Sequence, residues 1–112
     1  MDQLLHALAT EQEAQARIKL SLADYQLAVR SLLPVALTDT SGGRVAARLL
    51  LSLYDGDAYP FPLPDLCGLD TPLLEQALIA IQGRAVLREE PHTVIENGAA
   101  TFQRLIEQWG QS

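Results

Sequence analysis

The sequence has few cysteines, few aromatic residues and no long apolar run, and each shortage excludes a class of protein. A single cysteine, Cys67, cannot form an internal disulfide and is typical of a reducing compartment. No apolar stretch approaches the roughly 20 residues that cross a bilayer, and the N-terminus lacks the basic and apolar pattern of a signal peptide. We therefore expect a cytoplasmic protein without a membrane partner.

The shortage of aromatic residues limits how the core is built. One Trp, three Tyr and two Phe occur among 112 residues, so Leu, Ala, Val and Ile must fill most of the interior. These residues include the strongest helix formers, and a chain of this length has room for one domain with one core. We expect a single helical domain over residues 1–112.

Positive charge is scarce as well. The net charge is −6, from 14 acidic and 8 basic residues, and residues 34–83 alone carry six acidic and two basic groups, a net charge of −4. Such a chain lacks the cationic surface that contacts phosphate backbones, so direct binding to nucleic acid is not expected.

The N-terminal third carries the longest periodic pattern. Nine positions recur there at alternating spacings of four and three, and all but Glu11 and Gln15 are apolar, which is typical of a coiled-coil seam that is imperfect near its start. We favour one long helix over residues 1–33, projecting from the domain and pairing two copies of the chain. The alternative is two helices with a break, because Ser21 and Asp24 have the spacing of a capping box. The predicted seam of this homodimer consists of Leu4, Leu8, Ile18, Leu22, Tyr25 and Val29.

Three further helices are expected after Pro34. They cover residues 44–54, a segment that begins after Asp70 and stops at Gly83, and residues 102–109. Residues 59–64 carry proline at every second position and should form an extended strap. Residues 84–97 fit either a short strand or a continuation of the preceding helix. The fold class is all-α, with four to five helices, a long N-terminal helix and one extended proline-rich strap.

No residue pattern points to catalysis, a cofactor or a metal. Cys67 and His92 could form a nucleophile–base pair, but the apolar neighbours of Cys67 favour a buried, inert thiol. Two histidines and one cysteine do not supply a zinc spacing. The segment Ser41-Gly42-Gly43-Arg44 is not a P-loop, and helix capping is its ordinary explanation. We expect a protein that is not an enzyme, and we assign no catalytic, cofactor-binding or metal-binding residue.

Two features favour binding to another protein. One is the N-terminal seam. The other is the acidic surface with the strap, although the strap is first of all expected to cover the chain's own core. The residues predicted for this second surface are Asp55, Asp57, Tyr59, Phe61 and Asp65.

We interpret the chain as a non-catalytic accessory protein that binds an unidentified protein, as a homodimer. One alternative is an acidic inhibitor of a host defence or nucleic-acid-processing complex, which offers carboxylates in place of phosphates. A small enzyme with a Cys/His site is the remaining alternative.

Several short segments also resemble a known family. They are residues 39–46, Leu49-Leu50, residues 61–66, Leu69-Asp70, Pro91-His92 and residues 102–109. Together they are similar to a small uncharacterised proteobacterial family found on plasmids, phages and integrated mobile elements. The resemblance covers about residues 33–110, and Pro62 stands where the family pattern has an acidic residue. It implies a helical fold and assigns no activity.

Overall fold

The computed structural model describes residues 2–17 and 20–110 of the chain, and these residues form helices and no strand. The all-α prediction is confirmed. The α-helices are α1 (Asp2–Arg17), α2 (Leu22–Ala36), α3 (Ser41–Tyr54), α4 (Thr71–Leu87) and α5 (Gly98–Trp109). Two 3₁₀ helices, η1 (Leu63–Gly68) and η2 (Pro91–Thr93), lie on either side of α4 in the sequence.

The N-terminal third forms two helices, so the prediction of one long helix over residues 1–33 is wrong and the two-helix alternative is correct. Ser21 caps α2: its hydroxyl accepts from the amide of Asp24 at 3.2 Å, and the Asp24 carboxylate accepts from the amide of Ser21 at 3.0 Å. The pKa of Asp24 is lowered first by the hydrogen bond that its carboxylate accepts from the Ser21 amide, and second by one that it accepts from the Ser21 hydroxyl at 3.0 Å. Because this reciprocal cap satisfies backbone donors of a new helix, it starts α2 at residue 22.

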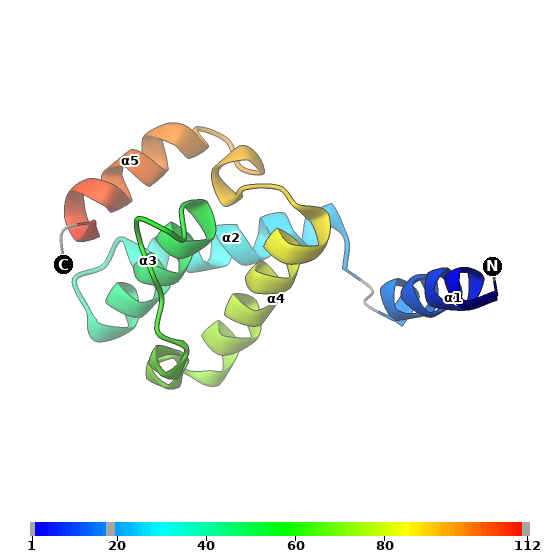
Figure 1. The fold of residues 1–112 in the computed structure, drawn as a ribbon. Helices are drawn as coiled ribbons and strands as arrows, with labels where there is room; N and C mark the ends of the chain where they lie inside the picture. The colour runs from blue at the N-terminus through cyan, green and yellow to red at the C-terminus, as the bar shows by residue number, and fades with distance from the viewer. Residues whose placement is uncertain (1, 18–19, 111–112) are drawn as a thin grey trace.

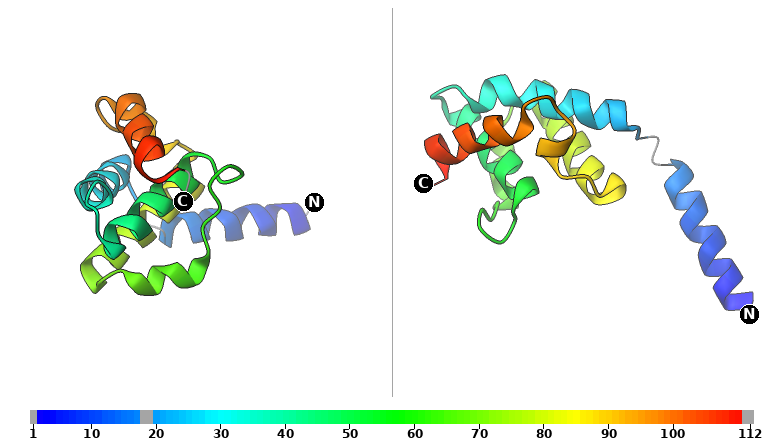
Figure 2. Two further views of the ribbon diagram at one scale, coloured as in Figure 1. Left: turned by 90° about the vertical axis from the view of Figure 1, so that its left-hand side faces the viewer. Right: turned by 90° about the horizontal axis from the view of Figure 1, so that it is seen from above.

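Helices α2 to α5 pack around one core, and α1 lies apart from them in every view (Figures 1 and 2). Helix α2 packs against both α3 and α4, and α5 packs against α3, with η2 beside both α3 and α5. The largest fully buried side chains belong to Tyr25, Leu32, Leu50, Leu51, Phe102 and Leu105. The core is therefore built mainly by the apolar faces of α2, α3 and α5.

Small residues allow α2 and α4 to approach closely. Ala77, Ala80 and Gly83 follow one another at intervals of three along α4, and all three are buried. A Cβ atom at Gly83 would overlap the ring of Tyr25 and lie 2.9 Å from its Cβ. Gly83 therefore makes room for Tyr25. The sequence had predicted that the helix stops at Gly83, and this prediction is wrong. Helix α4 continues to Leu87 and ends at Arg88, whose φ of 62° is left-handed.

The strap crosses from the end of α3 to the start of η1. Its backbone is extended at Pro62, with φ −70° and ψ 121°, and Tyr59 and Phe61 are half-buried against the core. The predicted covering role of the strap is confirmed. Its predicted extended conformation is found up to Pro62, whereas Leu63 and Pro64, which were also expected to be extended, begin η1. The predicted helix start after Asp70 is also confirmed, because the Asp70 carboxylate accepts from the amide of Leu73 at 3.0 Å.

Candidate functional site

The exposed apolar surface of α1 is the first candidate site. Leu4, Leu5 and Leu8 are 64%, 62% and 51% exposed, although leucine is a residue that folded proteins tend to bury. Spacings of three and four residues place Leu5 and Leu4 each beside Leu8 on the helix surface. The three side chains thus form a small apolar face, called here the α1 leucine face.

The remaining predicted seam residues do not continue this face. Tyr25 and Val29 are fully buried in the core, so their assignment to a dimer seam is wrong. Leu22 is 47% exposed at the start of α2, beyond the break in the helix, and Ile18 lies outside the described residues. The periodicity continued across residues 2–33 because the apolar stripe of α2 faces its own bundle with the same spacing.

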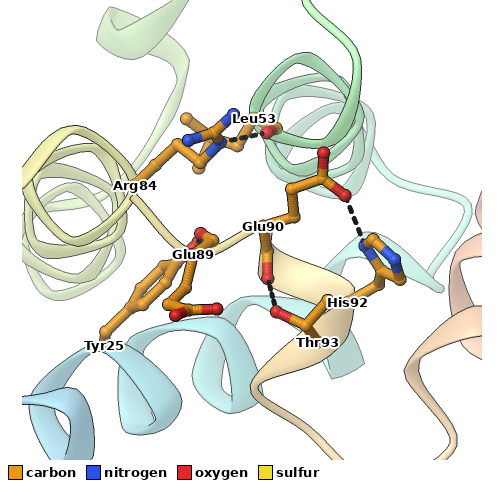
Figure 3. A network of polar contacts seen from close by, with 7 residues as sticks. All are labelled: Tyr25, Leu53, Arg84, Glu89, Glu90, His92 and Thr93. Carbon is orange, nitrogen blue, oxygen red and sulfur yellow. Dashed lines mark hydrogen bonds and ion pairs between the residues drawn. The ribbon is translucent and has the colours of Figure 1, made fainter. Parts of the chain in front are cut away.

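Tyr25 instead belongs to a group of polar contacts that joins α2 to the segment after α4 (Figure 3). Its hydroxyl donates to the carbonyl oxygen of Glu89 at 2.7 Å, and nearby the Nε of Arg84 donates to the carbonyl oxygen of Leu53 at 3.0 Å. Burial raises the pKa of Tyr25 to about 12; Arg84 opposes this shift, and Glu89 and Glu90 add to it. These two bonds attach the C-terminal end of α4 to α2 and α3.

The raised pKa of Tyr25 predicts a loss of stability at alkaline pH. Its contribution is complete below pH about 10, the pKa of an exposed tyrosine, and is lost as the pH rises through the folded-state value. Tyr25→Phe should lower the free energy of unfolding by about 1 kcal/mol at neutral pH, because it removes the hydrogen bond. It should also remove the part of the alkaline loss of stability that comes from ionisation of Tyr25. Urea unfolding between pH 7 and 11.5 measures both effects. Tyr59→Phe is the control, and an equal response of the two variants would contradict the assignment.

His92 lies between α3 and α5. Its ring contacts Tyr54 edge-on, with centroids 4.9 Å apart, and its Nδ1 is 3.6 Å from a carboxylate oxygen of Glu90. Together with Tyr54, Asp55 and Glu90 it lines an open cavity of about 350 Å³. Cys67 is on η1, is not among the residues that line this cavity, and is exposed, which corrects the expectation of a buried thiol. In the described part of the chain, no three His, Cys, Asp or Glu side chains are grouped to hold a metal ion.

The predicted acidic surface is only partly present. Asp55 and Asp57 are exposed in the turn after α3, where a carboxylate oxygen of Asp55 accepts from the amide of Ala58 at 3.2 Å. Asp65 is instead 3.6 Å from the guanidinium of Arg48. Part of the negative charge predicted for this surface is therefore neutralised.

A groove along α3 is the second candidate site, with η1 opposite α3 in one part of it and the strap in the other. It consists of two cavities of about 410 Å³ and about 290 Å³, and Arg48 lines both. The first cavity is lined by Ser41, Arg44 and Asp65 among others, and the second by Tyr59, Trp109 and strap prolines. The two cavities adjoin at Arg48 and are called here the α3 groove. Arg44 and Arg48 are one helical turn apart on α3, and the sequence alone could not show that η1 faces them.

These features define a small all-α protein with two candidate interaction surfaces, the α1 leucine face and the α3 groove. Each described helix is too short or too polar to cross a membrane. The chain belongs to a family of unknown function, DUF7673, whose model matches residues 26–110. No curated protein and no solved structure matches the chain. The match covers most of α2 and all of α3 to α5, and α1 lies outside it. It begins earlier than the resemblance in the sequence, which covered about residues 33–110.

Proposed function

We propose that this chain is a non-catalytic protein-binding module that pairs with a second copy of itself through α1. The observation that supports this proposal is the α1 leucine face, whose three side chains are each more than half exposed. Helix α1 has 16 residues and lies apart from the bundle (Figures 1 and 2). Isolated helices of this length are marginally stable in water, because most helical stability in proteins comes from packing an apolar face.

A second copy is the simplest partner for the leucine face. It carries the same three leucines, and a twofold axis brings identical apolar faces together in a closed contact. Full burial of an exposed leucine contributes about 1.5–3 kcal/mol, and these leucines are 51–64% exposed, so burying six of them contributes roughly 5–11 kcal/mol against an association cost of the order of 4–15 kcal/mol. We therefore expect a dimer whose dissociation is measurable at micromolar concentrations, with the bundles left free for other partners.

The test is the solution mass of the full chain by light scattering, over a concentration series from 10 µM to 1 mM. Leu4→Gln combined with Leu8→Gln should give a monomer at concentrations where the wild-type chain is a dimer. The matched control is His6→Gln combined with Thr10→Gln, which places the same side chain at two exposed positions on the opposite side of α1. It should dimerise like the wild type.

Far-UV circular dichroism provides a second readout of the same idea. If pairing stabilises α1, the helical signal of the wild-type chain should rise with concentration, and that of the Leu4→Gln/Leu8→Gln variant should not. A wild-type chain that stays monomeric up to 1 mM would contradict the dimer. A dimer that both pairs of substitutions leave intact would place the interface elsewhere.

A further inference from the structure

We propose that the α3 groove binds a short acidic peptide segment of a partner protein, with a carboxylate at Arg44 and an apolar side chain between Tyr59 and Trp109. This inference does not rest on the proposed dimer, because α1 does not line the groove. It names the chemistry of a partner for the bundle, which is the part of the chain that the family match covers.

The groove follows one face of α3. Ser41, Arg44, Arg48 and Leu51 line its two cavities and are separated by three, four and three residues, which places them along one side of a helix. The ten steps along the helix from Ser41 to Leu51 span about 15 Å, at about 1.5 Å per residue. An extended peptide rises about 3.3 Å per residue, so about five residues would fill this length.

The charges at one end favour a carboxylate. Arg44 and Arg48 are the only basic residues in the segment 34–83, and both line the same cavity. Arg48 is 3.6 Å from Asp65, whereas Arg44 is exposed and has no ion pair among those recorded for the described residues. The N-terminus of α3 is not what binds the carboxylate in this proposal, because the hydroxyl of Thr40 already accepts from the amide of Gly43 at 2.9 Å.

The other end favours an apolar anchor. Trp109 and Tyr59 are half-buried there, and the indole Nε1 of Trp109 donates to the carbonyl oxygen of Ala36 at 2.8 Å, which fixes the ring. The strap prolines that complete the wall hold the backbone in a restricted conformation. A binding site whose walls are already ordered loses less entropy when its ligand binds.

The same charges disfavour a nucleic acid. A polyanion would approach a chain of net charge −6, with Asp65 at the groove and one unpaired arginine beside it. Binding to a phosphate backbone requires several cationic contacts. A peptide with one or two carboxylates requires only Arg44, with Arg48 as a second contact when Asp65 releases it.

The experiment is a titration of the full chain with capped hexapeptides that carry Asp-Glu at one end and Leu-Phe at the other, in both orders. The matched peptides carry Asn-Gln in place of Asp-Glu. Binding is followed by calorimetry and by the fluorescence of Trp109, the single tryptophan of the chain. We expect at least one acidic peptide to change the Trp109 emission. This peptide should bind about tenfold more tightly than its amide counterpart, because the amide peptide lacks one charge-assisted contact.

Three variants locate the binding. Arg44→Gln should weaken the acidic peptide about tenfold, and Asp65→Asn, which frees Arg48, should strengthen it a few fold. Arg104→Gln, at an exposed position of α5, removes the same charge elsewhere and should change nothing. All three are checked for an unchanged helical signal. The proposal is overturned if acidic and amide peptides bind alike, if Arg44→Gln has no effect, or if a 12-nucleotide single strand binds in an Arg44-dependent manner and the peptides do not.

Discussion

Gly98→Ala is expected to destabilise the protein by about 3 kcal/mol or more, because a methyl group at this position would overlap the backbone of η2. The added Cβ would lie 2.6 Å from the carbonyl carbon and 2.9 Å from the Cα of His92, and would overlap its carbonyl oxygen. A backbone atom cannot rotate away as a side chain can. Helix α5 and η2 would have to separate, although they pack against each other and against α3.

The matched control is Gly42→Ala in α3. A Cβ at Gly42 would meet no atom within 4 Å, so this substitution should be neutral or should stabilise the chain by up to about 1 kcal/mol. Urea unfolding followed by circular dichroism measures both variants against the wild type. An unchanged midpoint for Gly98→Ala would mean that η2 and α5 are not held together as described.

Local signals in the sequence were sufficient to locate most of the helices. Asp70 supplies a cap whose chemistry is independent of the rest of the fold, and its carboxylate accepts from the amide of Leu73 as expected. Phe102 and Leu105 form the apolar stripe of α5 and are buried. Such features depend on residues within one or two turns, so a single sequence contains the information.

Features that depend on tertiary contact were misjudged. Thr10 and Glu13 have the same capping-box spacing in the sequence as Ser21 and Asp24, yet only Ser21 is observed to cap a helix. The Thr10 hydroxyl instead donates to the carbonyl of His6 within α1. Cys67 has apolar neighbours but lies at the surface of η1, where a short 3₁₀ helix exposes it. In each case the spacing was correct, and the surroundings of the residue decided its role.

In the candidate sites, too, the sequence predicted what depends on nearby residues and missed what depends on tertiary contact. The sequence identified Leu4 and Leu8 as a potential contact surface, and the structure leaves both exposed. It also assigned Asp65 to an acidic surface, whereas the ion pair with Arg48 places it at the edge of the α3 groove. Only the path of the strap brings Asp65 to α3, and proline spacing does not specify where an extended segment lies.

Gly83→Ala is expected to destabilise the protein by about 2–3 kcal/mol, a typical cost of adding a methyl group to a filled core. Helix propensity alone would predict the opposite sign, because alanine is favoured over glycine inside a helix by about 1 kcal/mol. The steric effect should dominate, since the new Cβ would overlap the ring of Tyr25. That ring is fully buried, and its hydroxyl is bonded to the carbonyl of Glu89, so it has little freedom to move.

A double-mutant cycle separates this explanation from a general loss of stability. Tyr25→Ala alone should cost about 3–5 kcal/mol, as for other large buried aromatic residues. In the Tyr25→Ala background the ring is gone, and Gly83→Ala should then be neutral or stabilising. The two substitutions should therefore be non-additive by about 2–3 kcal/mol, which is a coupling expected only for residues in direct contact. Urea unfolding of the four proteins measures the coupling, and additive effects would show that Gly83 does not serve to accommodate Tyr25.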